Sequence, residues 1–389
     1  MYQFERSAYE KRMQWFREAR FGLFLHWGLY AIPARGEWVR NQEQMPEESY
    51  LPFFEEFRAE DFDPKAWAKA AKEAGMRYAV LTAKHHDGFC LFDSKLTDFK
   101  STNTPCGRDI VREFLNAFRA EGLRVGLYYS LLDWHHPDYP HYGDMHHPMR
   151  NRAECSNEGR DFDRYLEYMH GQVRELCENY GKLDILWFDF SYGDMRGEAW
   201  KAGELVDMVR TLQPGVIIDN RLEVSGEGFG SLYECRPTPW HGDFVSPEQM
   251  IPPEGLQNVE GKDIAWEACV TMNRFWGYAP DAFYKPADLL IKKLVECVSK
   301  GGNLLLNVGP DARGNFPPES MERLKAIGAW MRLNSRSIYG CGKAGIEKPD
   351  YGRVTRNRNK LYFHIYENTL GPLPQKKKKK DQIASIRWL

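Results

Sequence analysis

Short apolar runs recur along the chain, and most of them are separated by segments with helical periodicity. Runs of this length, bounded by turn residues, are typical of strands that are buried on both faces. Strands that alternate with helices predict a parallel sheet with helical crossovers. The seven runs cover residues 21–28, 78–84, 125–130, 183–190, 216–221, 264–272 and 303–310.

Polar or ionisable residues stand at the C-terminal end of each run. The run 183–190, for example, carries Asp189 next to the loop-like residues 191–194. In parallel α/β folds the loops at that end gather on one face. Because every run shows this feature, we expect a (β/α)8-like, TIM-type barrel rather than an open sheet. A single strand-end aspartate can equally cap a turn or pair with an arginine, so its position alone does not assign chemistry to Asp189.

The intervening segments predict helices at about 4–20, 63–75, 109–121, 161–180, 196–212, 286–300 and 317–335. The second of them has clear end signals. Asp63 suits the N-cap, Pro64 the first helical position and Gly75 the stop. Residues 222–262 are rich in Gly and Pro and predict an irregular segment without a nucleotide-binding GxGxxG pattern.

The pattern changes from about residue 343, where strands at 353–358, 360–367 and 383–389 follow one another without helices. We therefore expect a catalytic barrel over 1–340 and the start of a C-terminal β domain over 341–389. So short a β-sandwich would leave strand edges unpaired, which predicts weaker stability or assembly. The five lysines at 376–380 predict a solvated turn rather than a nucleic-acid site.

Composition excludes several classes of partner. The net charge of −2 does not indicate binding to nucleic acid or to an anionic membrane. The eight cysteines form no CxxC pair, which argues against a structural zinc site and favours a reducing compartment. No stretch resembles a signal peptide or reaches the length of a membrane span. We expect a soluble chain that is cytoplasmic, or secreted or periplasmic after loss of a signal. The sequence does not determine its oligomeric state.

The chemistry that suits these features is the hydrolysis of sugars. Aromatic residues make up 14% of the chain, and aromatic rings stack on the apolar faces of sugars. Hydrolysis of a glycosidic bond with retention requires two carboxyl groups about 5 to 5.5 Å apart. Asp189 is one candidate. The other candidates are Glu223, Glu227, Glu234, Glu248 and Glu254, and their spacing does not choose among them.

Six motifs in a fixed order carry a family resemblance. They are FGLFLHWG at 21–28, GEW at 36–38, LTAKHHDGF at 81–89, GLYYS at 126–130, LWFD at 186–189 and GGNLLLNVGP at 301–310. Over roughly residues 10–340 the chain resembles glycoside hydrolase family 29, the retaining α-L-fucosidases. The resemblance implies an exo-acting enzyme without cofactor or metal that removes terminal α-L-fucosyl residues from oligosaccharides or glycoconjugates by double displacement.

The resemblance also implies residue roles. Asp189 matches the family nucleophile, and Glu248 matches the acid/base glutamate. The matches to substrate-binding groups are His26, Glu37, Trp38, His85 and His86 for the sugar hydroxyls, Tyr128 and Arg221 beside the two carboxylates, Trp187 on the strand of the nucleophile, and Phe24, Phe190 and Trp276 for the fucose methyl group. The loop around Arg35 departs from the family, because it is basic where family members often place an aromatic residue.

Two other functions remain open at this point. A metal-dependent hydrolase is one, because His135, His136, His141, His146 and His147 lie close together, although without HExxH spacing. A non-catalytic fucose-binding barrel is the other. Such a protein would lack one of the two carboxylates, whereas both candidates are present here.

Overall fold

The computed structural model describes residues 2–224, 228–280 and 282–367. Glu227, the lysines at 376–380 and the predicted strand at 383–389 lie outside the described residues. Within them, every helix is too short or too polar to cross a lipid bilayer.

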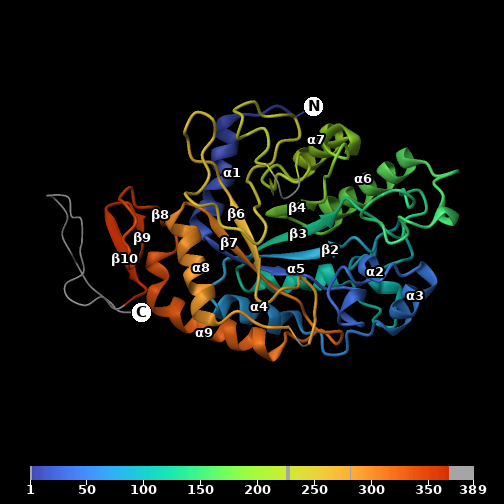
Figure 1. The fold of residues 1–389 in the computed structure, drawn as a ribbon, viewed down its shortest axis with the longest axis horizontal. Coiled ribbons are helices and arrows are strands. Elements are labelled where there is room, and N and C mark those ends of the chain that lie inside the picture. The colour runs from blue at the N-terminus through green and yellow to red at the C-terminus, as the bar shows by residue number, and fades with distance from the viewer. Residues whose placement is uncertain (1, 225–227, 281, 368–389) are drawn as a thin grey trace.

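The predicted parallel sheet is confirmed. In the described residues it has seven strands, and it curls around the centre of the molecule in the order β5-β4-β3-β2-β1-β7-β6 (Figure 1). The strands are β1 (Phe21–Leu25), β2 (Tyr78–Lys84), β3 (Arg124–Ser130), β4 (Ile185–Asp189), β5 (Ile217–Ile218), β6 (Glu267–Thr271) and β7 (Asn303–Val308). All seven are parallel, as their helical crossovers require.

An irregular stretch, residues 243–249, lies between the two edge strands β5 and β6 and is called the closing segment here. Isolated parallel bridges join it to both sides: Asp219 to Phe244, Val245 to Trp266 and Glu248 to Cys269. The sheet thus becomes a closed barrel whose eighth position is not a regular strand. The sequence predicted only an irregular segment there, because residues 222–262 are rich in Gly and Pro.

The predicted helices are confirmed, and two more lie between β1 and β2. The helices are α1 (Arg6–Ala19), α2 (Val39–Gln42), α3 (Glu47–Glu56), α4 (Pro64–Glu73), α5 (Ile110–Ala120), α6 (Phe162–Asn179), α7 (Ala202–Leu212), α8 (Ala287–Ser299) and α9 (Pro318–Asn334). Asp63 caps α4 as predicted, since its side chain accepts from the backbone of Lys65 and Ala66. In place of the single helix predicted at 196–212 the structure has a short 3-10 helix (Gly197–Trp200) and α7. The two are separated by Lys201, whose φ is +48°.

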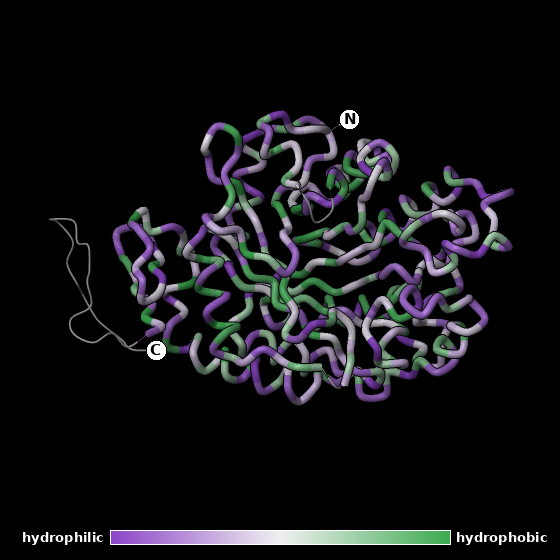
Figure 2. The backbone as a smooth tube through the Cα atoms, in the orientation of Figure 1, coloured by the Kyte–Doolittle hydropathy of each residue, from purple (hydrophilic) through white to green (hydrophobic). Residues whose placement is uncertain are grey.

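The strands separate two apolar cores. Alternate residues such as Leu23 and Leu25 face outward under the helices, whereas Phe24 faces the barrel interior. Tyr9, Met13 and Phe16 of α1 belong to the interior core and cover the end of the barrel where the strands begin. Figure 2 shows the strands as a hydrophobic centre inside a more polar shell. These residues close the end of the barrel where the strands begin, which is called the floor below. The C-terminal ends of the strands therefore form the accessible face.

A small antiparallel sheet follows the barrel. It consists of β8 (Gly342–Lys343), β9 (Gly352–Asn357) and β10 (Lys360–Ile365) in the order β10-β9-β8. It lies beside α8 at one end of the molecule (Figure 1), where Arg353 bonds Glu296 at 2.9 Å. The two strands predicted at 353–358 and 360–367 are confirmed within a residue or two.

Candidate active site

A pocket of about 160 Å³ opens at the C-terminal ends of the strands. Its lining consists of Phe24, His26, Trp38, His85, His86, Tyr128, Trp187, Asp189, Phe190, Arg221, Glu248, Cys269 and Trp276. Twelve of the thirteen residues predicted from the sequence are in this lining. The exception is Glu37. The tertiary structure adds Cys269, for which the sequence carried no signal beyond its place in a predicted strand.

Asp189 is the last residue of β4, and its carboxylate points into the pocket. The Arg221 Nη1 donates to its Oδ1 at 2.7 Å, and the Tyr128 hydroxyl donates to its Oδ2 at 2.7 Å. Burial raises the pKa of Asp189 above its usual value, Arg221 opposes this shift, and the nearby Glu248 adds to it. Each oxygen therefore has one donor and can accept a further hydrogen bond.

Glu248 enters the pocket from the end of the closing segment. Its Oε2 accepts from the Arg221 Nη2 at 3.0 Å, and its Oε1 accepts from the Trp276 indole at 3.2 Å. The Glu248 side chain is 37% exposed, compared with 11% for Asp189. One buried guanidinium thus holds two carboxylates side by side, one inside the pocket and one towards solvent.

The structure separates Glu248 from the other described glutamates that the sequence left open. Glu223 is buried in its own loop, where it accepts from Ser231, Thr238 and Gly242. Glu234 and Glu254 are exposed and do not line the pocket. Glu248 is therefore the glutamate of this set that the fold brings to Asp189.

His26 has a defined tautomer. Asn307 donates its amide to the Trp276 carbonyl at 2.7 Å, so its Oδ1 is left to accept from the His26 Nδ1 at 2.7 Å. The unprotonated Nε2 of His26 is then an acceptor. Burial lowers the pKa of His26 to about 3, so this ring is neutral at ordinary pH.

The tautomer of His86 is assigned in the same way. The Ser130 hydroxyl donates to the Leu132 carbonyl at 2.9 Å, so it accepts from the His86 Nδ1 at 2.6 Å. Burial also lowers the pKa of His85 and His86 well below the usual value. Three neutral imidazoles, two of them with assigned acceptor nitrogens, therefore line one side of the pocket.

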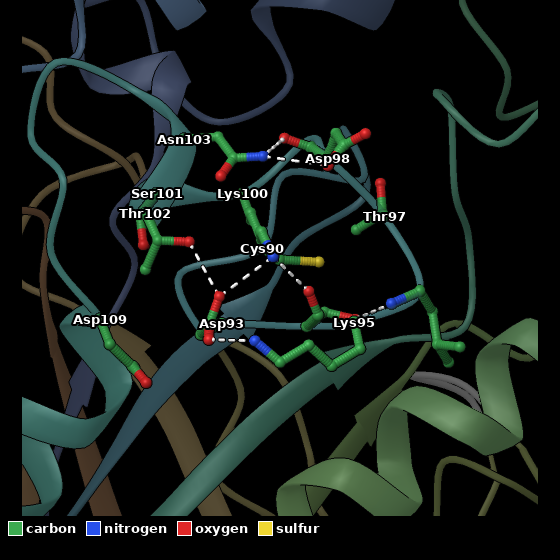
Figure 3. Close-up of polar contacts among 12 residues, drawn as sticks. Cys90, Asp93, Lys95, Thr97, Asp98, Lys100, Ser101, Thr102, Asn103 and Asp109 are labelled. Carbon is green, nitrogen blue, oxygen red and sulfur yellow. Dashed lines mark hydrogen bonds and ion pairs between the residues drawn. The ribbon is translucent and has the colours of Figure 1, made fainter.

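The loop after β2, which begins with these histidines, is held by a polar network (Figure 3). Asp93 accepts from Lys95 at 2.7 Å and pairs with Lys100 at 3.0 Å, and Asn103 donates to the Asp98 carbonyl at 3.0 Å. Hydrogen bonds from the two lysines lower the pKa of Asp93 to about 2. The network fixes the far end of a long loop, whose near end carries the pocket residues.

Comparison with known proteins identifies the family of the chain. The family model described as alpha-L-fucosidase matches residues 1–336. The chain belongs to the alpha-L-fucosidase family. It is accordingly a glycoside hydrolase, as the motifs implied, and enzymes of this family act on fucosylated substrates.

Relatives and solved structures agree with this membership. The tissue alpha-L-fucosidase of Rattus norvegicus is 32% identical over 371 residues, which are 89% of this chain and 72% of that protein. The alpha-L-fucosidase isoenzyme 1 of Paenibacillus thiaminolyticus has a TM-score of 0.92 and 59% identity, covering 94% of this chain and 86% of its own. Both similarities cover most of the chain.

A third similar structure bears on the mechanism. It is a glutamate-to-glutamine variant of a Bacteroides thetaiotaomicron alpha-L-fucosidase, trapped as a covalent intermediate with 2-fluoro-fucosyl fluoride. Its TM-score is 0.79 at 33% identity, with 94% of this chain and 84% of that chain covered. A covalent glycosyl-enzyme is the signature of retention, so this is a family of retaining α-L-fucosidases, and double displacement is its mechanism.

The histidine-rich loop does not support the metal alternative for this fucosidase. His141 and His147 stack on each other at 4.1 Å, whereas His135 stacks on Phe99 and His146 packs against Phe190. Within the described part of the chain, no group of three or more His, Cys, Asp or Glu residues has the arrangement of a metal site. Family membership likewise does not favour a non-catalytic barrel.

Glu37 is placed behind the pocket wall of this fucosidase. Its Oε2 accepts from the backbone nitrogens of Trp276 and Gly277 at 3.0 and 2.8 Å. These bonds hold the loop whose Trp276 indole donates to Glu248. Arg35, by contrast, is exposed and bonds Glu43, so the basic loop does not enter the pocket lining.

Aromatic rings form the remaining walls. Phe24 contacts Trp187 and Trp276 at ring distances of 5.3 and 5.8 Å. Trp38 and Phe190 contact each other at 5.5 Å on the other side. Phe190 has a φ of +87°, which is rare for a bulky residue and typical of functional sites. This backbone conformation turns the chain directly after Asp189.

Proposed function

We propose that Asp189 is the nucleophile and Glu248 the acid/base in the release of terminal α-L-fucosyl residues from oligosaccharides or glycoconjugates. The observation that carries this proposal is the pair of carboxylates on the single Arg221 guanidinium at the base of a fucosidase pocket. Arg221 keeps Asp189 available as an anion against the effect of its burial.

The reaction proceeds in two displacements. Asp189 attacks the anomeric carbon while Glu248 donates a proton to the departing glycosidic oxygen. This breaks the bond to the leaving alcohol and forms a β-fucosyl ester on Asp189. Glu248 then takes a proton from water, which attacks the same carbon and frees the carboxylate. Fucose leaves with its α configuration retained, and Glu248 is protonated again.

The pocket suits a deoxy sugar. The Nε2 acceptors of His26 and His86 are placed to receive hydroxyl protons, and the Trp38 indole lies beside them. L-Fucose lacks the hydroxyl at C6, and the wall around Phe24 and Trp276 offers an apolar surface for its methyl group.

The closed floor supports exo action. Beneath the pocket the interior is packed with apolar residues from the strands and from α1. A sugar chain therefore has no exit on that side, and we propose that one terminal residue enters while the remainder of the substrate stays in solvent. We also propose that the barrel domain ends near residue 340, just before the small sheet starts at Gly342.

The acid/base assignment is tested by Glu248→Ala. Protonation matters most for poor leaving groups, so hydrolysis of natural fucosides should fall by about 10²- to 10⁴-fold. Formation of the fucosyl-enzyme from a nitrophenyl fucoside should fall far less. Added azide should restore turnover and give α-L-fucosyl azide, because azide attacks the β-linked ester without needing a base.

Glu254→Ala is the matched control. Glu254 is an exposed glutamate outside the pocket lining, and its loss should change neither the leaving-group dependence nor the response to azide. If Glu248→Ala showed neither effect, the acid/base role would have to move to another residue. The nucleophile assignment would stand or fall separately, through the Asp189 variants described below.

A further inference from the structure

The residue after Glu248 has an uncommon backbone conformation. Gln249 has a φ of +54°, in the left-handed region that glycine and asparagine adopt more readily than other residues. It ends the closing segment and has no role in the mechanism above. A glutamine stays in this conformation only where its surroundings hold it, and such residues are frequent at functional sites. The contacts of Gln249 therefore bear on the carboxylate that precedes it.

The side-chain amide of Gln249 bonds Thr271 at both of its ends. Its Nε2 donates to the Thr271 hydroxyl oxygen at 3.0 Å, and its Oε1 accepts from the Thr271 backbone nitrogen at 3.3 Å. Thr271 is the last residue of β6 and is fully buried, whereas Gln249 is exposed. The Gln249 backbone nitrogen also donates to the Cys269 carbonyl at 2.9 Å. Main chain and side chain thus both attach Gln249 to β6.

These bonds hold the backbone on the C-terminal side of Glu248. On its N-terminal side, the Arg221 Nη2 donates to the Ser246 carbonyl at 3.2 Å. The Cys269 backbone nitrogen donates to the Pro247 carbonyl, also at 3.2 Å. The Glu248 side chain itself is 37% exposed. Its orientation therefore depends on its hydrogen bonds and on the backbone that is held on both sides of it.

The end of β6 also supports the Trp276 donor to Glu248. The Thr271 hydroxyl donates to the Asn273 carbonyl, and the irregular chain that follows leads to Trp276. The Trp276 indole donates to the Glu248 Oε1 at 3.2 Å. Thr271 is thus connected to Glu248 in two ways, through Gln249 and through the chain that carries Trp276.

Lys285 holds the end of β6 from outside the pocket. Its Nζ donates to the Thr271 carbonyl at 2.7 Å and to the Asn273 carbonyl at 2.6 Å. Both acceptors belong to the chain segment that Gln249 contacts. The partner of the Gln249 amide is therefore fixed, even though Gln249 itself is exposed.

We propose that Gln249 is a positioning residue for the acid/base step, because its amide holds the left-handed backbone after Glu248 against Thr271. The inference rests on the proposed role of Glu248. Gln249 is outside the pocket lining, and its effect on the reaction passes through Glu248. Proton transfer to the departing oxygen depends on the placement of the carboxyl group, so a small displacement of Glu248 slows it.

The test is Gln249→Asn. Asparagine tolerates the left-handed backbone, but its side chain is one methylene shorter and does not reach Thr271 in the same way. Phenyl and 4-nitrophenyl α-L-fucoside share a ring and differ in how much their leaving groups need a proton. We expect kcat/KM to fall about ten-fold for the phenyl fucoside and to stay within about two-fold for the nitrophenyl fucoside. Equal losses would show a general structural role or a direct contact with the ring, and would overturn the proposal.

The double variant Glu248→Ala/Gln249→Asn separates this inference from the proposed function. Once the carboxyl group is gone, Gln249→Asn should change kcat/KM for the phenyl fucoside by less than about two-fold. A further ten-fold loss would overturn the inference and leave the acid/base assignment intact. If Glu248→Ala alone showed neither leaving-group dependence nor azide rescue, the proposed function would fail, and the inference with it.

Thr271→Val tests the other partner of the amide at nearly constant side-chain volume. It removes the acceptor of the Gln249 Nε2 and keeps the backbone donor to Oε1, so the phenyl fucoside should lose about three-fold in kcat/KM and the nitrophenyl fucoside less than two-fold. Equal losses for the two fucosides, or none, would overturn the proposal. Gln257→Asn is the matched control, because Gln257 is an exposed glutamine whose amide bonds Asp263 at 3.2 Å. It should leave kcat/KM unchanged for both fucosides.

Discussion

Two clusters of arginine and carboxylate groups contain them in opposite ratios. In the pocket cluster, Arg221 serves two carboxylates, Asp189 and Glu248. In the cluster near the start of β5, Asp243 is shared by Arg12 of α1 and Arg210 of α7, at 2.7 and 2.6 Å. The closing segment connects them, because it begins at Asp243 and carries Glu248 near its other end.

The difference shows that the ratio of arginines to carboxylates determines the direction in which the pKa of a buried carboxylate shifts. Burial alone would raise the pKa of Asp243, but Arg210 and Arg12 outweigh it and keep that pKa below its usual value. Asp243 also accepts from the backbone nitrogen of Ile218 at 3.0 Å, so its oxygens are fully used. Asp189 has one cation shared with a second anion, and its pKa is raised. The first arrangement stabilises a fold, and the second leaves a carboxylate able to react.

The largest expected effect is on turnover. Asp189→Asn should lower kcat by at least about 10⁴-fold, since loss of a covalent nucleophile removes several kcal/mol of transition-state stabilisation. Asp243→Asn, the matched change in the other cluster, should keep the activity of each folded molecule within about ten-fold. Kinetics with an aryl α-L-fucoside, normalised to the folded fraction, measure both. Equal losses in the two variants would show that Asp243 also acts on the reaction.

The second-largest effect is on stability. Here the change at Asp243 should have the larger effect, and the change at Asp189 the smaller one. Asp243→Ala leaves two buried guanidinium groups without their carboxylate, and breaking such a pair costs about 3 to 5 kcal/mol. Asp189→Asn removes a desolvated anion and should leave the free energy of unfolding unchanged or raise it. Urea unfolding followed by circular dichroism compares them. A destabilised Asp189→Asn would mean that the pocket cluster also stabilises the fold.

The smallest effect is in the pH dependence of stability. Asp243 has a lowered folded pKa, so its contribution is present above the unfolded value of about 3.9 and is lost as the pH falls through the folded value. Asp189 has a raised folded pKa, so its contribution is present below about pH 3.9 and is lost as the pH rises. Tm curves from pH 3 to 7 should therefore show Asp243→Asn approaching the parent at acid pH. The advantage of Asp189→Asn should instead grow towards neutral pH, and parallel curves would contradict both assignments.

Most of the fold could be predicted from local sequence features. The strands were recognised because both of their faces are buried, which leaves continuous apolar runs, and α4 was recognised from its cap residues Asp63 and Pro64. Short helices such as α2, with four residues, have too few turns to show a period. The closing segment was missed for a related reason, since its bridges to β5 and β6 are long-range contacts without a strand-like pattern.

The sequence by itself determined the barrel, the position of Asp189 at the end of an apolar run and the family motifs, because periodicity, caps and strand ends depend on neighbouring residues. Only the tertiary structure brought Glu248, rather than Glu223 or Glu254, onto Arg221. It alone also gave Asp243 two cations. These pairings join residues far apart in the chain, and burial and distance are set when the barrel closes. The pKa values and chemical roles of these carboxyl groups therefore follow from the closed barrel and cannot be derived from the spacing of residues along the chain.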